Sequence, residues 1–169
     1  KLNMHHRDGG KGTILIKTPA NLKTVEPAFG KDERYIWYSR RTGSWQYNAK
    51  FPQYQLAKYD RETGISKTMT SRYGSAFSPT LSSNGKWLVY GTRWNDKTGL
   101  IARELKTGSE KWLAYPIQKD DQESQATLGV LPAMTFTPDS QNLLTSYDGK
   151  IYSIPIDGGD AKNIAFNVN

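Results

Sequence analysis

Tyr35-Ile-Trp-Tyr-Ser39 is a run of aromatic and branched residues, and it begins six positions after Phe29. The same arrangement returns twice, as Trp87-Leu-Val-Tyr-Gly91 after Leu81 and as Asn142-Leu-Leu-Thr-Ser146 after Phe136. Aromatic and β-branched residues fit the half-buried surface of a pleated strand. The runs start 52 and 55 positions apart, so each is a predicted strand in a repeating unit.

Three further strands are predicted around each run. The first strand of each repeat leads into Phe29, Leu81 or Phe136, the third covers Gln55 to Asp60, Leu100 to Glu104 and Lys150 to Ile154, and the fourth runs through Thr68, Trp112 and Ile164. Glycines at 10, 64, 108 and 159 end equivalent turns, because glycine supplies the positive φ that tight turns need. Serial four-stranded antiparallel units are typical of β-propeller blades. We therefore predict an all-β chain of fourteen strands and no helix.

The repeats predict a partial β-propeller of four-stranded antiparallel blades: three blades plus the outer half of another. We expect a single domain over residues 1–169, with an outer half-blade at 1–24 and blades at 25–70, 76–115 and 131–166. Closed propellers need roughly 4 to 8 blades, so this arc cannot close a ring. We expect it to belong to a larger protein, and its open faces to be covered by missing blades or a second copy. Alone, the chain should self-associate or bind hydrophobic dyes.

The composition excludes several classes of function. There is no cysteine, which removes disulfides and thiolate metal sites, and no apolar run approaches the roughly 20 residues of a membrane span. The net charge is +7, but the 23 basic residues are scattered among 16 acidic ones. Nucleic-acid binding needs a basic stripe interleaved with stacking aromatics. Arg40, Arg41, Trp45 and Tyr47 come nearest to one, and a solvated loop is the favoured interpretation, so no nucleic-acid partner is predicted.

Loop lengths indicate the candidate binding face. Connections between second and third strands, and from one blade to the next, lie on one face of a propeller. They are long in this sequence: Arg41 to Pro52, Ser71 to Ser75, Arg93 to Thr98 and Tyr115 to Val130. Connections on the other face are short turns. Because binding residues concentrate on long loops, the first face is the predicted binding surface.

Six residues of these loops are binding-face candidates. Four are large aromatics, which are favoured at the centres of interfaces: Trp45, Tyr47, Phe51 and Trp94. Packing over the propeller rim is an equally weighted alternative for them. If they bind a partner, changing Trp45 and Tyr47 to Ala should weaken docking without unfolding the chain. The other two, Asp120 and Asp121, have the oxygen ligands that calcium prefers, but their spacing matches no calcium loop and a solvated acidic loop is favoured.

No catalytic, metal or cofactor site is predicted. The only histidines, His5 and His6, are expected on a third strand, where neighbouring side chains point to opposite faces and cannot bind one metal. No Gly-x-Ser-x-Gly elbow is present, and Asp8-Gly-Gly-Lys-Gly12 fits a hairpin turn rather than a phosphate loop.

The repeats resemble the TolB-type propeller repeat, in which Pro-x-Phe-Ser-Pro-Asp-Gly leads to a strand. The resemblance rests on Pro27-Ala-Phe29, Phe136-Thr-Pro-Asp139 and Tyr59-Asp-Arg-Glu-Thr-Gly64. Gly30-Lys-Asp-Glu33 and Ser82-Ser-Asn-Gly85 depart from the motif and keep the turn. The resemblance covers essentially the whole chain and implies a periplasmic or otherwise extracytoplasmic location.

A narrower resemblance is to the amino-terminal propeller of exported bacterial amidohydrolases. It rests on Ser39-Arg-Arg-Thr-Gly43, on Gln46 to Gln55 and on Gly85-Lys-Trp-Leu-Val-Tyr90. In that family a metal-dependent hydrolase barrel follows the propeller, and the barrel's histidine and acidic metal ligands have no counterpart in this sequence. The resemblance implies a non-catalytic scaffold or interaction module that docks on the catalytic domain of the same parent chain. The alternatives are a TolB-like envelope propeller that binds a separate protein, and the substrate-gating propeller of a serine peptidase.

Overall fold

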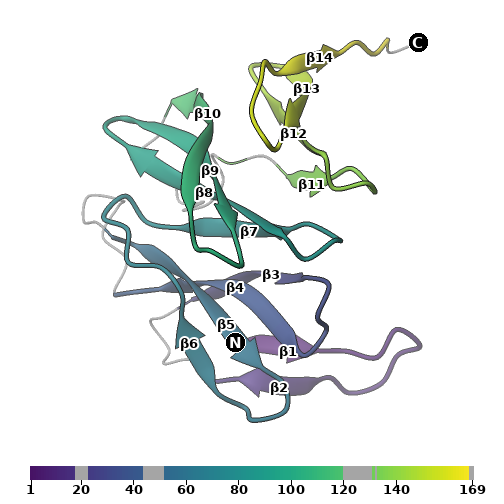
Figure 1. Ribbon diagram of the computed structural model, residues 1–169. Helices are drawn as coiled ribbons and strands as arrows, with labels where there is room; N and C mark the ends of the chain where they lie inside the picture. Colours follow the sequence, from purple (N-terminus) through teal and green to yellow (C-terminus); the bar gives the residue numbers. More distant parts are fainter. Residues whose placement is uncertain (18–22, 44–51, 120–130, 132, 168–169) are drawn as a thin grey trace.

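The computed structural model describes residues 1–17, 23–43, 52–119, 131 and 133–167. These residues form fourteen β-strands in four antiparallel sheets, which lie side by side along the chain (Figure 1). No helix occurs in the described part of the chain, and hence none that could cross a membrane. The predicted all-β class, strand count and order are confirmed.

The sheets follow the chain in order. The first has two strands, β1 (Leu2–Met4) and β2 (Thr13–Ile16). The second contains β3 (Thr24–Phe29), β4 (Tyr35–Arg41), β5 (Tyr54–Asp60) and β6 (Ser66–Thr68). The third contains β7 (Phe77–Leu81), β8 (Trp87–Trp94), β9 (Lys97–Glu104) and β10 (Glu110–Lys119). The fourth contains β11 (Met134–Phe136), β12 (Asn142–Tyr147), β13 (Lys150–Pro155) and β14 (Lys162–Ile164).

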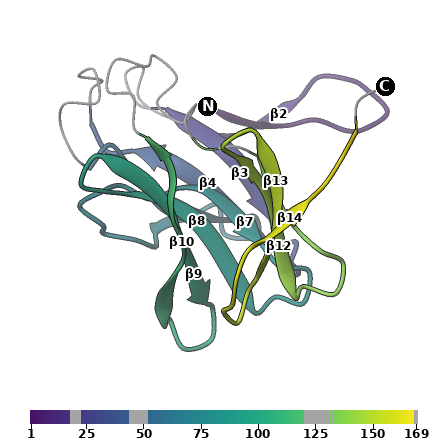
Figure 2. The same cartoon turned by 90° about the horizontal axis from the view of Figure 1, so that it is seen from above.

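Each full sheet is a meander in which sequential strands pair. The β4–β5 ladder runs unbroken from Tyr35 opposite Asp60 to Arg41 opposite Tyr54. The turn glycines 10, 64, 108 and 159 all have positive φ, as the repeat predicted. Figure 2 shows the strands of successive sheets fanning out, as expected for blades whose faces meet while their outer edges diverge.

The hydrophobic core lies between the sheets. One cluster, including Leu2, Tyr38 and Tyr59, fills the space between β1–β2 and the second sheet. A second packs Leu56 of β5 against Leu88 of β8, both fully buried. A third joins the third and fourth sheets and includes Val89, Leu100 and Leu143. Each internal sheet therefore buries apolar residues on both faces, which explains the near-continuous apolar runs.

Two predicted loops are wrong. Arg93 to Thr98 is a tight hairpin, because β8 continues to Trp94 and β9 begins at Lys97. Only Asn95 and Asp96 remain in the turn, and Asn95 supplies the required positive φ of 54°. The first part of the expected loop from Tyr115 is strand as well, since β10 extends to Lys119.

The histidines are also placed differently from the prediction. β1 ends at Met4, so His5 and His6 lie in the following turn region and not on a strand. The Nδ1 of His6 accepts a hydrogen bond from the backbone N–H of Asp8, at 3.2 Å. The imidazole therefore supports the local turn.

A bidentate ion pair fixes one hairpin at the short-turn face. Arg34 donates from Nε and Nη2 to the two carboxylate oxygens of Asp60, at 2.9 and 2.6 Å. Asp60 also accepts the backbone N–H of Glu62, at 2.9 Å, within the turn that ends at Gly64. The hydrogen bonds from Arg34 are the main reason that the pKa of Asp60 lies well below its ordinary value.

Replacing Arg34 with Gln should raise the pKa of Asp60 toward its ordinary value. Because the folded pKa is depressed, this carboxylate stabilises the fold above the unfolded value of about 3.9, and the contribution is lost as the pH falls toward the folded pKa. As the pH is lowered from about 5 to about 2, the free energy of unfolding should therefore fall further for the parent chain than for Arg34→Gln. Thermal midpoints across this range measure the difference. Arg7→Gln, at an exposed pair with Asp8, is the control and should leave the profile unchanged.

Candidate docking groove

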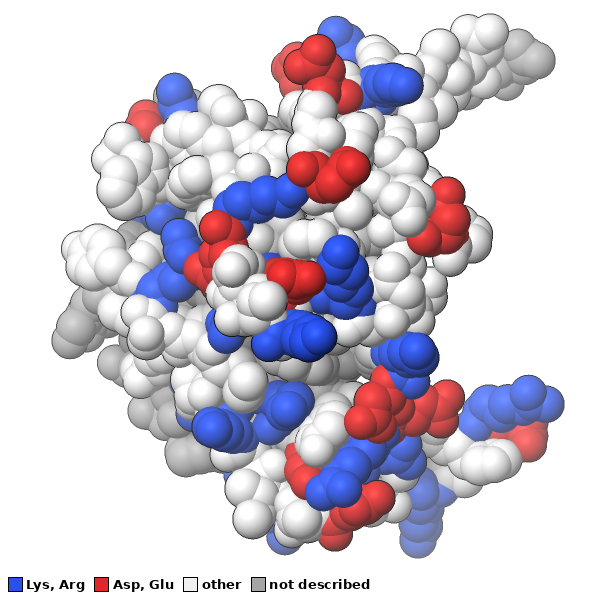
Figure 3. Space-filling model, in the orientation of Figure 1, with Lys and Arg blue, Asp and Glu red and all other residues white. Residues whose placement is uncertain are grey.

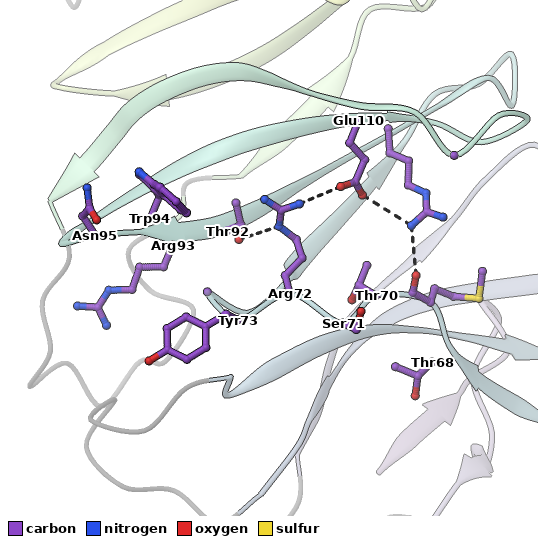
Figure 4. A pocket seen from close by; sticks show the side chains of 14 residues that line it. Thr68, Thr70, Ser71, Arg72, Tyr73, Thr92, Arg93, Trp94, Asn95 and Glu110 are labelled. Carbon is purple, nitrogen blue, oxygen red and sulfur yellow. Dashed lines mark hydrogen bonds and ion pairs between the residues drawn. The ribbon is translucent and has the colours of Figure 1, made fainter.

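A groove of about 1160 Å³ lies between the second and third sheets (Figure 4). One wall is the segment 68–74, which connects β6 to the third sheet. The other wall is formed by the ends of β8 and β9 and the start of β10. We call it the linker groove. Its end at Tyr73 and Trp94 lies where a blade-to-blade connection meets the β8–β9 hairpin, on the predicted binding face, and its other end reaches Gly108 in the β9–β10 turn.

Hydrogen bonds tie the connecting segment to the second sheet. The side-chain oxygen of Gln55 accepts from Thr70 Oγ1 at 2.7 Å and from the backbone N–H of Arg72 at 3.1 Å. Its Nε2 donates to the carbonyl oxygen of Arg72 at 2.6 Å. One buried amide therefore satisfies both backbone groups of Arg72 and fixes the point from which that side chain enters the groove.

Close backbone contact ties the same segment to the third sheet. The backbone N–H of Arg93 donates to the carbonyl oxygen of Gly74 at 2.9 Å. A Cβ on Gly74 would lie 1.8 Å from the carbonyl oxygen of Arg93, so only glycine permits this approach. The groove wall is thus held from both sides.

The floor of the groove is an ionic cluster around Glu110. Arg72 donates from Nη1 to Glu110 Oε2 at 2.8 Å and from Nε to Thr92 Oγ1 at 3.3 Å (Figure 4). Tyr90 donates its hydroxyl to Glu110 Oε1 at 2.7 Å. Arg103 lies 3.7 Å from the same oxygen and donates to the carbonyl oxygen of Met69 at 3.2 Å. Two guanidinium groups therefore share one carboxylate, which leaves the floor with net positive charge.

Tyr90 is a permanent donor in this cluster. Burial, and then its hydrogen bond to Glu110, raise the pKa of Tyr90 well above the ordinary value for tyrosine. The phenol stays protonated at neutral pH. It can therefore orient the carboxylate that holds Arg72.

Exposed aromatic rings flank the groove. Tyr73, on the connecting segment, is 81% exposed, and Trp94, at the end of β8, is 59% exposed. Figure 4 shows Trp94 on the β8 side and Tyr73 on the side of the connecting segment. Tyr115 donates its hydroxyl to the carbonyl oxygen of Trp94 at 2.9 Å and packs against Trp112 with ring centroids 5.1 Å apart. Large exposed aromatics at a groove with a fixed floor are typical of docking surfaces.

Of the six predicted binding-face residues, Trp94 lies in this groove. The other five, Trp45, Tyr47, Phe51, Asp120 and Asp121, lie outside the described residues. Arg72, Tyr73 and Glu110 were not singled out from the sequence. Tyr73 lies within Ser71 to Ser75, a connection on the predicted binding face. Its large aromatic side chain in that connection is the sequence feature that could have identified it as a binding candidate.

The two arginines that came nearest to a nucleic-acid-binding stripe in the sequence do not lie in a solvated loop. Arg40 and Arg41 both belong to β4, and Arg41 is only 3% exposed, with its guanidinium 5.9 Å from the centre of the Tyr54 ring. On the face seen in Figure 3, basic and acidic side chains are interleaved. That face presents no continuous basic stripe.

A partly buried carboxylate links the two innermost strands, β3 and β7, through Ser39. Glu26 of β3 accepts a hydrogen bond from Ser39 Oγ at 3.1 Å, and Ser39 Oγ accepts from the backbone N–H of Ser78 in β7 at 3.0 Å. Glu26 and Ser78 hold corresponding positions in their repeats and have φ of 54° and 56°. Among the described residues, no three His, Asp or Glu side chains are placed to hold a metal ion. The hydrogen bonds through Ser39 make this carboxylate part of the contact between the second and third sheets.

Replacing Glu26 with Gln should stabilise the chain at neutral pH. Burial raises the pKa of Glu26, and the hydrogen bonds from Ser78 and Ser39 oppose this only in part. A carboxyl whose folded pKa is raised costs stability as the pH rises above its unfolded pKa of about 4.3. Glu26→Gln removes that cost and keeps an acceptor for Ser39. Its thermal midpoint should exceed the parent's at pH 7 and match it near pH 4; a lower midpoint at pH 7 would contradict this account.

Comparisons with known proteins agree on the fold. No family model and no curated protein matches the sequence. Among solved structures, TolB from Acinetobacter baumannii is similar with a TM-score of 0.74 and 19% identity, covering 97% of this chain and 37% of that one. A putative TolB from Agrobacterium tumefaciens has a TM-score of 0.65 and 14% identity, covering 92% and 52%. An oligogalacturonate lyase in complex with manganese has a TM-score of 0.61 and 18% identity, covering 90% and 40%.

These likenesses concern the fold, since all three identities are below 20%. The chain spans between about a third and a half of each of these proteins. Its sheets correspond to part of a propeller, which confirms the predicted architecture of blades in an incomplete ring. The chain therefore has the fold of a partial TolB-like β-propeller.

Proposed function

We propose that this chain is a non-catalytic docking module of a larger exported protein, and that the linker groove is its docking site. The observation that supports this is the pairing of two exposed aromatics, Tyr73 and Trp94, with a floor fixed by Arg72 and Glu110. Rigid aromatic anchors with a nearby arginine are the residues that dominate binding at protein interfaces. Among the described residues that line the groove, none is a nucleophile paired with a base, and the exposed aromatics and the arginine support binding.

The partner in this proposal is a catalytic domain of the same parent polypeptide, of the metal-dependent amidohydrolase type. The support is the sequence resemblance around Ser39 to Gly43 and Gly85 to Tyr90. A second candidate is a TolB-like envelope propeller that docks a separate protein, and the similarity to two TolB structures favours it. Both candidates place the protein outside the cytoplasm.

Site-specific photo-cross-linking in the intact parent protein tests the docking site. A benzoylphenylalanine residue is placed at Tyr73 or at Trp94, and the adduct is identified by mass spectrometry. Ile65 is the control position: it is 65% exposed, but it lies in the β5–β6 turn on the opposite face. We expect adducts at 73 and 94 and none at 65.

The identity of the adduct separates the two candidates. A link to a hydrolase domain of the same chain supports the amidohydrolase parent, and a link to one defined separate protein supports the envelope propeller. Absence of adducts at both groove positions, or equal labelling at Ile65, overturns the linker groove as the docking site. Sequencing the reading frame on either side of residues 1–169 shows independently whether a catalytic domain exists.

A further inference from the structure

A second cleft, of about 720 Å³, lies between the same two sheets and has a different chemistry. Arg103 and Met69 line both this cleft and the linker groove, so they form the partition between them. The cleft opens toward the short-turn face, beside Gly30 to Asp32 and Asn84 to Gly85. Tyr73 and Trp94 do not line it. We call it the basic cleft.

The inner part of the basic cleft is apolar. Trp37 is only 7% exposed and belongs to the core cluster between the sheets, against which Leu81, Leu105 and Met69 pack. These four side chains come from β4, from β7 and from the segments that follow β6 and β9, and they are held by the core behind them. Clefts of roughly 300 to 1,000 Å³ with apolar linings and a few polar groups are the usual form of small-molecule sites.

The rim of the cleft is cationic. Lys31, Lys58 and Arg103 line it against a single carboxylate, Asp32. Asp32 is engaged by its own turn, where it accepts the backbone N–H of Arg34 at 3.0 Å. Within the described part of the chain, neither lysine has a carboxylate within ion-pair distance.

Lys58 is held in place by aromatic rings instead. Its Nζ lies 4.1 Å from the centre of the Tyr35 ring and 5.8 Å from that of Trp37. Cation–π contacts fix the ammonium group while leaving its hydrogen-bond donors without an anionic acceptor. The aliphatic stem of Lys31 packs over Gly85, where an added Cβ would lie 3.1 Å from the Cβ of Lys31. One ammonium group held by aromatic rings, and a second lysine that lines the same rim, therefore stand beside an apolar wall.

We propose that the basic cleft binds a small amphipathic anion: a carboxylate or sulfonate carried on an aromatic or aliphatic body. The acid group would pair with Lys31 and Lys58 and so supply the negative charge that would balance the cationic rim. The apolar body would lie against Trp37 and Leu81. Charge-assisted hydrogen bonds are stronger than neutral ones, and the nearby apolar wall lowers the local dielectric further.

Titration with 2-naphthoate, followed by amide NMR shifts of the 169-residue chain, tests this site. 2-Naphthylmethanol carries the same ring without the charge. We expect naphthoate to shift the amides of Lys31, Gly85 and Leu105, and the alcohol to bind at least roughly tenfold more weakly. Lys58→Gln and Lys31→Gln should each weaken naphthoate binding roughly tenfold, whereas Lys162→Gln, on exposed β14, should not change it.

Three results would overturn the proposal. They are equal affinity for the alcohol, shifts confined to the outward face of the fourth sheet near Phe166, and affinity that neither lysine variant changes. If Lys58→Gln disturbs the packing of Trp37, Lys31→Gln decides, because Lys31 lies on an exposed turn. The result is independent of the docking proposal, since no variant touches Tyr73 or Trp94.

Discussion

Gly74→Ala is expected to lower the free energy of unfolding by roughly 3 kcal/mol, the upper end of the range for overpacking. The added Cβ would lie 1.8 Å from the carbonyl oxygen of Arg93 and 2.8 Å from its carbonyl carbon. Both neighbours are backbone atoms, so no side-chain rotation relieves the collision. Urea denaturation measures the change, and the thermal midpoint should fall by about 10 °C.

The matched control is Gly43→Ala. Among the described residues, no heavy atom lies within 4 Å of a Cβ built on Gly43, and its φ is not in the left-handed region. We expect its effect to stay within about 0.5 kcal/mol, as for ordinary surface substitutions. Equal stability of the two variants would show that the segment after β6 is free to move away from β8. The linker groove would then lack its fixed wall, and cross-linking at Tyr73 would lose its selectivity.

Most of the fold could be predicted because its local signals repeat. The runs beginning at Tyr35 and Trp87 are apolar on both faces, since their strands pack between two sheets, whereas the run at Asn142 packs against the third sheet alone. The turns at Gly64 and Gly108 need a positive φ, which marks the end of each hairpin in the sequence. Pattern and turn chemistry therefore agree at every blade, and the order of the strands follows from them.

The hairpin at Trp94 shows where this reasoning fails. Arg93-Trp-Asn-Asp-Lys-Thr98 has no apolar alternation, so the sequence favoured a loop. In the structure Trp94 pairs with Lys97 and Arg93 with Thr98, because strands that are already in register continue to pair beyond the core. The ladder extends toward the rim, where side chains need not be apolar. Strand ends of this kind carry no hydrophobic signal.

The binding groove could be predicted only in part. An aromatic in a connection on the long-loop face, such as Trp94, is visible in the sequence. The ionic floor is not, because Arg72 and Glu110 are 38 positions apart and meet only through the packing of two blades. A sequence pattern does not state which charged side chains face each other across neighbouring sheets. The same holds for Lys58 in the basic cleft.

Glu110→Ala should remove the floor of the linker groove and cost roughly 3 kcal/mol, about 1.5 kcal/mol for each of two charge-assisted hydrogen bonds. These are the bonds from Arg72 at 2.8 Å and from the Tyr90 hydroxyl at 2.7 Å. Tyr90→Phe should lose only one of them and cost about half as much. In Glu110→Gln the carboxylate that raises the pKa of Tyr90 is gone, so this pKa should fall while burial still holds it above the ordinary value.

Glu104→Ala is the matched control, since its side chain is 26% exposed against 27% for Glu110. Glu104 has a distant ion pair with Lys86, at 3.8 Å, and accepts a hydrogen bond from Thr107 within its own turn. Its removal should cost about 1 kcal/mol or less. If both variants lose the same stability, Glu110 acts as an ordinary surface carboxylate. We expect Glu110→Ala to lose both stability and cross-linking at Tyr73, and Glu104→Ala to retain both. That result would show that the shared carboxylate fixes Arg72 and thereby the shape of the docking groove.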